Sequence, residues 1–386
     1  MAATLSLAPL LDMVAQGAAE ADRERTLADT TINALKGNDI MRFTASEELG
    51  GLNRSIVDTG RELEALAGSC ASTAWVIWNH LCTFHLFAGL LGPHNIQFLR
   101  GITTAHEWVC FPAGASTGIK GVPAEECMTL QGKAAFGSGA RYAEWAGASF
   151  VCDDAAKPLF ALVNLAQDQV SIDADWQAMS LRASATDTVR YDGARVSREN
   201  VVPFPFMYRE KFREPERDMI HPRYREDWVA LSDMWLGLMA VGLVQACFDE
   251  VAQGIKDRVA IMGVKVAQRP TVHVNLGQAA ANLQTARDTV VAACAETDTR
   301  IAARVTPTET DYLRQLAASV SALQLCDEAL RRLVRVNGGN GLREGPDFER
   351  RVRDFQAMPL HINAHQDRVT EQLGRHALGL PPENPF

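Results

Sequence analysis

The segment QGKAAFGSGARYAEWAGASFV, residues 131–151, decides the fold class because it interrupts a chain that is otherwise helical in pattern. Apolar residues alternate here, or occur in short runs such as 134–136 and 149–152, between frequent glycines. That pattern is typical of β-strands, and it extends from about residue 105 to about residue 205. Within this block, Asp192-Gly193 between VRY and ARV predicts a two-residue hairpin turn. We therefore expect antiparallel β-structure in the middle of the chain.

Helical periodicity flanks the β block on both sides. Leu7, Leu10 and Val14 fall at helical spacing near the start of the chain. Beyond about residue 225, three long segments carry apolar stripes, and such stripes are buried best in an antiparallel bundle. A last helix is predicted from about residue 346 to about residue 378. The sequence thus indicates a mainly α protein with an N-terminal helical domain (1–104), a central antiparallel β domain (105–217) and a C-terminal four-helix bundle (218–386).

Composition excludes several classes of protein. The 386 residues are 47% hydrophobic and 22% charged, as in ordinary soluble domains. A net charge of −9 argues against nucleic-acid binding and against an anionic membrane surface. The eight cysteines are scattered without a CxxC pair, which predicts reduced thiols, no metal centre and a cytoplasmic location. No apolar run approaches the ~18 residues of a membrane span.

Histidines and aromatic residues are the first candidates for a site, because no Walker A, GxGxxG, HExxH or GxSxG motif occurs. His80 and His85 lie in an apolar helical segment, either as satisfied core histidines or as the wall of a pocket for a flat aromatic ligand. The aromatic side chains suited to such a pocket are Trp75, Trp78, Phe84 and Trp108.

A second pair of histidines, His361 and His365, is spaced to share one face of a helix if that segment is helical. The spacing fits either one buried and one exposed histidine, or a metal-binding pair that would need a third ligand. Hydroxyl groups beside glycines occur at Ser116, Thr117 and Ser138. They fit plain turn chemistry, or hydrogen bonds to a polar heterocycle.

Five segments, taken in order, resemble the acyl-CoA dehydrogenase family. Ala135 stands where that family usually has Trp, and Leu181 and Ala185 also depart from its common choices. The resemblance implies the same succession of helical domain, β domain and C-terminal four-helix bundle. The segments are 70–80, 131–151, 179–203, 254–270 and 336–361.

The sequence resembles one branch of this family most. His361 follows the pair Arg353-Asp354 at the spacing found in two-component flavin-dependent monooxygenases. That branch includes the oxygenase component of 4-hydroxyphenylacetate hydroxylase, dibenzothiophene monooxygenase and indole-oxidising enzymes. Acyl-CoA dehydrogenases instead carry a catalytic Glu in a Tyr-Glu-Gly context, which is absent here, with Asp367 and Glu371 the nearby carboxylates.

The resemblance implies an oxygenase component that receives reduced flavin, FMN or FAD, from a separate NAD(P)H-dependent reductase. With O2 as cosubstrate, a C4a-hydroperoxyflavin would hydroxylate a small aromatic substrate, phenolic or indolic. An acyl-CoA dehydrogenase-type oxidoreductase and an N-hydroxylase of an amine remain as alternatives. The resemblance also implies a homotetramer that binds flavin across subunits.

Residue roles follow from the same resemblance. His361 would be the acid/base group, Ser138 would hydrogen-bond near flavin N5, and His80 would be a further active-site histidine. The residues implied to hold the isoalloxazine ring are Ser116, Thr117, Ser138 and Trp145. Those implied to hold the flavin tail are Arg258, Gly338, Gly339 and Asn340.

Overall fold

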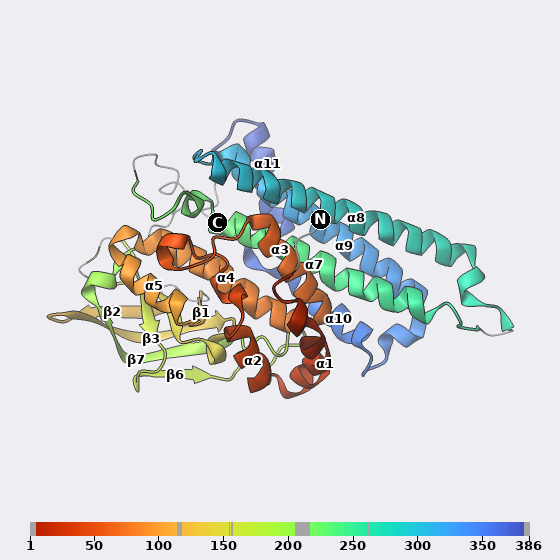
Figure 1. Cartoon of the computed structure of the whole chain (residues 1–386), viewed down its shortest axis with the longest axis horizontal. Coiled ribbons are helices and arrows are strands. Elements are labelled where there is room, and N and C mark those ends of the chain that lie inside the picture. The colour runs from red at the N-terminus through yellow and green to blue at the C-terminus, as the bar shows by residue number, and fades with distance from the viewer. Residues whose placement is uncertain are drawn as a thin grey trace.

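The computed structural model describes residues 5–113, 118–153, 155, 157–204, 217–260 and 263–381. The molecule is elongated, with the strands at one end and three long helices extending to the other (Figure 1). A mainly helical, acyl-CoA dehydrogenase-like fold with a β region in the middle of the chain is therefore confirmed. The boundaries at residues 104 and 217 remain predictions, although α5 ends at Thr104 and β1 begins at Val109.

The N-terminal part is built around one fully buried helix. This helix, α4, is apolar on every side, and Gly92, with a φ of 67°, ends it before Pro93. A helix that is hydrophobic all round has to be surrounded by protein, and α4 is. The helices of this part are α1 (Ala8–Glu24), α2 (Asp29–Lys36), α3 (Ile56–Ser69), α4 (Ala71–Leu91) and α5 (Ile96–Thr104).

Two four-stranded sheets form the β region, in the orders β1-β4-β5-β8 and β2-β3-β7-β6. All pairings are antiparallel except that of β1 with β4. The prediction of antiparallel β-structure is correct apart from this pair. The strands are β1 (Val109–Cys110), β2 (Ile119–Pro123), β3 (Cys127–Gly137), β4 (Trp145–Phe150), β5 (Leu159–Asn164), β6 (Val170–Asp173), β7 (Asp187–Ser197) and β8 (Val202–Pro203).

The hairpin predicted at Asp192-Gly193 is wrong. Strand β7 runs straight through these residues and pairs with β3 on one side and β6 on the other. Opposite Gly193 the register to β3 shifts between Leu130 and Gln131, and Gly193 has a φ of 88°. Gly193 therefore forms a β-bulge, which requires the same left-handed backbone conformation as a tight turn.

Three long helices form the C-terminal part: α7 (Trp228–Gly254), α8 (Pro270–Ala302) and α9 (Glu309–Asn337). They pack against one another, and α3 packs along α7, so that the two helical parts share one core. By length and composition α4 and α7 are apolar enough to cross a membrane. However, 94% and 89% of their most apolar windows are buried inside the protein, as expected of core helices.

The single last helix predicted for 346–378 is wrong. The structure has α10 (Asp347–Phe355) and α11 (Gln366–Ala377), separated by two short 3-10 turns that hold Pro359. Proline cannot supply the backbone N–H that a continuous helix needs. His361 therefore lies in an irregular connection, and His361 and His365 do not share a helix face.

Candidate active site

Ser138 lies in the turn that follows β3, and it is 6% exposed. Its Oγ accepts a hydrogen bond from Trp75 Nε1 of α4 at 3.0 Å. It also lies 3.1 Å from Thr186 Oγ1, which in turn lies 2.6 Å from Ser184 Oγ. A chain of three hydroxyl groups thus leads to Ser138 from the segment that precedes β7.

That segment has a strained backbone. Leu181 and Ala185 have φ values of 49° and 45°, a conformation that costs roughly 1 kcal/mol or more for a residue with a Cβ. These are two of the three positions noted above that depart from the pattern of the family that the sequence resembles. Asp354 Oδ1 accepts the Leu181 N–H at 2.6 Å, and burial raises the pKa of the Asp354 carboxyl to about 7. Asp354 therefore anchors the turn that carries Ser184 and Thr186.

His361 approaches the same place from the connection after α10. Its ring meets Trp78 and Trp75 edge-on, with centroids 5.0 and 5.7 Å away. Its Nδ1 is buried and has no hydrogen-bond partner within the described chain. Burial lowers the pKa of His361 to about 4, so the imidazole is neutral at pH 7. Trp75, between Ser138 and His361, joins the hydroxyl chain to a neutral, unpaired imidazole.

His80 is placed differently, although it also lies on α4. Its Nε2 lies 2.9 Å from the Met41 carbonyl, and its Nδ1 accepts the Val109 N–H at 3.1 Å. Both ring nitrogens are thus occupied by the main chain, which fixes a neutral tautomer with the proton on Nε2. Burial lowers the pKa of His80 to about 4. In this arrangement His80 has no nitrogen free to move a proton, which is the geometry of a structural histidine.

The aromatic residues predicted to line a substrate pocket are not all brought together. Trp78 contacts His361, and its Nε1 donates to the Ser232 carbonyl of α7 at 2.8 Å. Trp108 is fully buried beneath the turn at Gly139, and Gly139 is the residue that follows Ser138. Phe84 packs in a separate core cluster. Of the three, Trp78 has the most direct link to the site.

Two groups of residues implied to hold the flavin ring lie elsewhere or outside the described chain. Trp145 turns toward α5, where its Nε1 donates to Glu107 at 2.6 Å and its ring meets Phe98 edge-on at 5.1 Å. Ser116 and Thr117 lie outside the described residues. Neither observation assigns these three residues to the site around Ser138.

A larger pocket of about 690 Å³ lies at the far end of the bundle. Arg258 lies at its wall, and its Nη1 donates to the Asn337 carbonyl at 2.9 Å. Gly338, with a φ of 64°, starts the glycine turn beside it, which also contains Gly339. The polar residues of the lining are Arg258, Arg269, Thr271, Asn275, Arg335 and Asn340.

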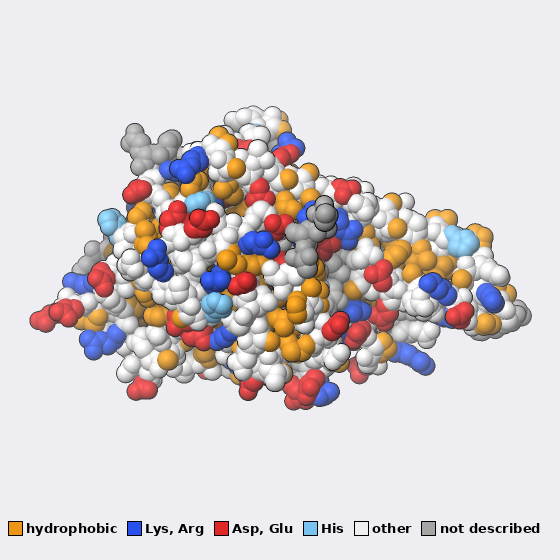
Figure 2. Space-filling view, in the orientation of Figure 1, with side chains coloured by type: hydrophobic (Ala, Val, Ile, Leu, Met, Phe, Trp, Pro, Cys, Tyr) orange, Lys and Arg blue, Asp and Glu red, His pale blue; other side chains and the backbone are white. Residues whose placement is uncertain are grey.

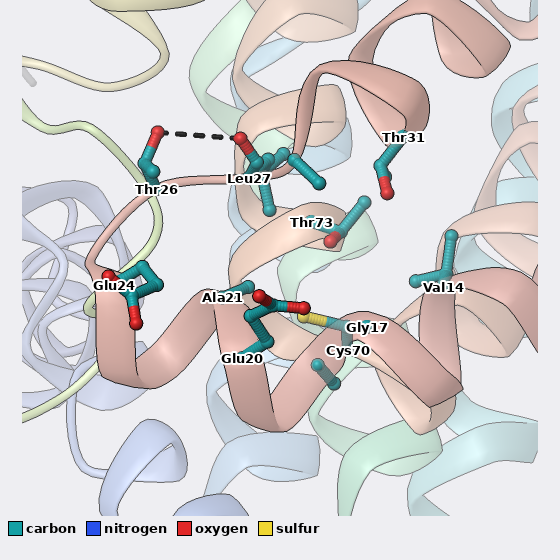
Figure 3. Close-up of a pocket in the computed structure, with 12 residues that line it drawn as sticks. Val14, Gly17, Glu20, Ala21, Glu24, Thr26, Leu27, Thr31, Cys70 and Thr73 are labelled. Carbon is teal, nitrogen blue, oxygen red and sulfur yellow. Dashed lines mark hydrogen bonds between the residues drawn. The ribbon is translucent and has the colours of Figure 1, made fainter.

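The pocket is lined by residues at the end of α7, the start of α8 and the end of α9. Figure 1 shows the end of the molecule where α7 leads into α8, opposite the strands. Ser138, Trp75 and His361 do not line this pocket within the described chain. A smaller recess of about 100 Å³ opens between α1 and the start of α4, beside Cys70 and Thr73 (Figure 3). Ligand pockets usually measure roughly 300–1,000 Å³, so this recess is too small for a flavin ring.

Sequence reasoning missed four residues of the site: Ser184, Thr186, Asp233 and Asp354. Asp233 is fully buried in α7, and neither carboxyl oxygen has a hydrogen-bond partner within the described chain. A usable signal existed, because Asp233 is the only acidic residue between Trp228 and Cys247, in an otherwise apolar stretch. Acidic residues are almost never fully buried without a partner. Among the described residues, no three His, Cys, Asp or Glu side chains gather as metal ligands.

Comparison with known families agrees with this architecture. A model described as the acyl-CoA dehydrogenase N-terminal domain matches residues 10–88, and one described as the acyl-CoA dehydrogenase C-terminal domain matches residues 234–366. The chain belongs to the acyl-CoA dehydrogenase superfamily.

Within it, the chain is similar to oxygenase components. It is 24% identical to the flavin-dependent monooxygenase oxygenase subunit of Rhodococcus jostii, covering 96% of this chain and 97% of that protein. It is 21% identical to the p-hydroxyphenylacetate 3-hydroxylase oxygenase component of Acinetobacter baumannii, covering 97% and 88%. The predicted resemblance to two-component flavin-dependent monooxygenases is thereby confirmed.

Solved structures share the fold. XiaF from Streptomyces sp., in complex with FADH2 and glycerol, superposes with a TM-score of 0.87 at 21% identity, covering 98% of this chain and 95% of that one. TdsC from Paenibacillus sp. A11-2, with FMN and indole, gives a TM-score of 0.86 at 17% identity, covering 98% and 97%.

Proposed function

We propose that this protein is the oxygenase component of a two-component flavin-dependent monooxygenase that hydroxylates a small aromatic substrate, phenolic or indolic. The observation that carries the proposal is the meeting of Ser138, Trp75 and His361, a hydroxyl chain and a neutral imidazole sheltered by indole rings. Similarity to named oxygenase components over nearly the whole chain supports it. The electrons would come from a separate NAD(P)H-dependent reductase.

The residues present fit a flavin in two places. Beside Trp75 of α4, Ser138 and the unpaired Nδ1 of His361 offer a hydroxyl and an imidazole to the polar edge of a ring. At the bundle end, the guanidinium groups of Arg258, Arg269 and Arg335 suit the phosphate of a flavin tail. Whether the tail is that of FMN or FAD is left open by these residues.

Since the arginine pocket and the cluster of Ser138, Trp75 and His361 share no lining residue, one flavin would be shared between two copies. A homotetramer fits the surface of the helical part. Figure 2 shows apolar side chains gathered over the long helices, among mixed acidic and basic groups. The large apolar side chains exposed in the last third of the chain include Val274, Leu342, Leu360, Ile362 and Leu378.

Reduced flavin, when bound, supplies the two electrons with which one atom of O2 passes to the substrate and the other leaves as water. The chain's part is to bind, orient and shelter. With the proton of His361 on its other nitrogen, the buried Nδ1 can accept a proton from a phenol O–H or an indole N–H. Loss of that proton raises the electron density at the ring carbon that receives the oxygen atom.

Ser138 has a complementary role as a donor. A hydroxyl has one proton to donate and two positions that accept. Trp75 fills one accepting position, and when Thr186 donates it fills the other. The proton of Ser138 is then left for the ligand. The buried rings of Trp75 and Trp78 exclude water from the space around both groups.

The direct test combines the purified chain with an NADH-dependent flavin reductase, FMN or FAD, and 4-hydroxyphenylacetate or indole under ¹⁸O2. We expect a product that carries one ¹⁸O atom, measured by mass spectrometry, and NADH use that matches product. Hydrogen peroxide equal to all NADH used, at the same rate with the chain left out, would refute the proposal.

A specific observation keeps an acyl-CoA dehydrogenase-type reaction as the second candidate. That reaction needs a carboxylate base. Asp367 and Glu371 of α11 are exposed and do not supply one, but Asp233 of α7 is a buried carboxyl near Trp78. Bleaching of oxidised flavin on addition of an acyl-CoA, without reductase, would favour this candidate over the monooxygenase.

A further inference from the structure

Asp233 lies beside a contact between α7 and α4, and further buried atoms without partners belong to α4 and to the connection that packs on it. Trp78 Nε1 donates to the carbonyl of Ser232, the residue before Asp233, so α4 packs on α7 at this turn. One residue further along α4, Asn79 Oδ1 is also buried without a partner. His361 Nδ1, whose ring lies against Trp78, is the third such atom.

Helical spacing brings these elements to one place. Residues 75, 78, 79 and 82 follow one face of α4, because residues three and four apart are neighbours on a helix. Cys82 also lies on this face. Burial raises the pKa of its thiol, and the negative charge of the Asp233 carboxyl raises that pKa further. At the other side, Arg368 of α11 donates to the Ile362 carbonyl at 2.6 Å, next to His361.

The charged surroundings of Asp233 do not satisfy it. Burial raises the pKa of its carboxyl well above the ordinary value and the charge of Asp227 raises it further, while Arg368 and the neighbouring Ser232 lower it. The Ser232 hydroxyl itself donates to the Val229 carbonyl at 2.8 Å and so leaves the carboxyl oxygens of Asp233 unpaired. A buried polar group without a partner costs free energy, and the cost is recovered when a ligand pairs with it. In either protonation state the carboxyl keeps an oxygen that accepts a hydrogen bond.

We propose that Asp233 is a specificity-determining residue that accepts a hydrogen bond from an N–H or O–H group on an aromatic substrate, bound where α7 packs against α4 beside the connection that carries His361. This inference rests on the proposed function, and it narrows the substrate to rings that bear such a donor. Phenols and indoles share this chemistry, whereas their O-methyl and N-methyl derivatives lack it. A site built around an accepting group rejects a substrate without the donor, because the group is then left unpaired.

The test compares matched ligands by isothermal titration calorimetry on the purified full chain, with and without FMN. The pairs are phenol with anisole and indole with 1-methylindole. We expect the wild-type protein to bind the donor of at least one pair about tenfold more tightly than its methylated partner. A wild-type protein that binds none of the four, or binds both members of each pair equally, overturns the proposal.

Three variants separate recognition from a structural role. Asp233→Leu should abolish the preference for the donor, and Asp233→Asn, which keeps a carbonyl oxygen, should retain part of it. Tyr191→Phe is the control, since Tyr191 Oη is another buried, unpaired polar atom but lies in strand β7. Loss of the preference in Tyr191→Phe, or its survival in Asp233→Leu, contradicts the proposal. Reductase-driven ¹⁸O incorporation, measured separately, reports on the proposed function itself.

Discussion

Two buried carboxyl groups, Glu226 and Asp233, lie near the start of α7 and differ in their partners. Arg300 Nε and Nη2 donate to the two oxygens of Glu226, each at 2.7 Å, and Gln315 Nε2 donates at 3.2 Å. Asp233 has no such partner on either oxygen within the described chain. Burial raises the pKa of both. Burial alone therefore does not distinguish a structural carboxyl from a functional one, whereas its partners do.

His80 and His361 differ in the same way, because one is paired and the other is not. Burial lowers the pKa of both His80 and His361 to about 4. Both nitrogens of His80 are engaged by the main chain, while Nδ1 of His361 is unpaired. The polar side-chain atoms of His80 and Glu226 are paired and stabilise the fold. Nδ1 of His361 and both carboxyl oxygens of Asp233 have no partner within the described chain, which is what we propose a ligand supplies.

The largest expected effect separates the histidines. His361→Ala should lower the hydroxylation rate by about 10²–10⁴-fold with little change in the melting temperature, because it removes an acid/base group that is not fully paired. His80→Ala should instead lower the free energy of unfolding by about 2 kcal/mol or more, since it leaves Val109 N–H and the Met41 carbonyl unpaired. Product formation and urea unfolding are measured for both. Equal effects of the two changes on both measurements would remove the contrast.

The two carboxyl groups should respond oppositely to the same isosteric change. Glu226→Gln weakens a buried ion pair and should cost roughly 3 kcal/mol of unfolding free energy. Asp233→Asn removes an unpaired buried acid and should leave stability unchanged or raise it by about 1 kcal/mol. Chemical denaturation of the ligand-free protein gives both values. A loss of stability in Asp233→Asn as large as that in Glu226→Gln would place Asp233 among the structural groups.

The pH dependence of the free energy of unfolding should test the structural role of His80. A histidine whose pKa is about 4 when folded and about 6.5 when unfolded contributes roughly 3 kcal/mol at neutral pH, which is lost as the pH falls from 6.5 toward 4. Asp354, with a raised pKa of about 7, contributes the opposite slope, so its stabilisation is lost as the pH rises toward 7. His80→Gln should therefore flatten the acid-side loss of stability seen in urea midpoints between pH 7 and pH 4.5. An unchanged slope would contradict the assignment.

The smallest effect concerns the hydroxyl chain. Thr186→Val keeps the shape of the side chain but frees one accepting position on Ser138 Oγ, so the Ser138 proton is no longer directed by its neighbours. A neutral hydrogen bond contributes about 1 kcal/mol, which corresponds to about fivefold. We expect the fraction of NADH that ends as hydrogen peroxide to rise several-fold, with flavin affinity little changed. Ser149→Ala, at another buried hydroxyl in β4, serves as the control.

Much of the fold could be predicted because it rests on periodicity. The apolar stripes of the bundle and the glycine-rich alternation of the β region both have clear periods. The two wrong predictions lie where one local sequence signal is compatible with two different structures. Asp192-Gly193 supplies the left-handed backbone of a bulge as readily as that of a hairpin, and Pro359 interrupts the segment whose pattern predicts one continuous helix.

The site was predictable in part. His361 and Ser138 were named from a resemblance, and the structure links both to Trp75. Thr186 and Asp233 were missed, because a hydroxyl chain and a missing partner are properties of three-dimensional neighbours. No spacing in the sequence states which of two buried acids will meet an arginine.

If one flavin is shared between two copies as proposed, the arginine pocket of one copy and the serine turn of the other would form one centre. A variant damaged at Arg258 and a variant damaged at His361 would then fail for different reasons. Mixed assemblies of the two would then contain some complete centres, and activity would reappear by complementation. The enzyme would also lose activity on dilution, since an isolated polypeptide holds two halves of different centres and no whole one.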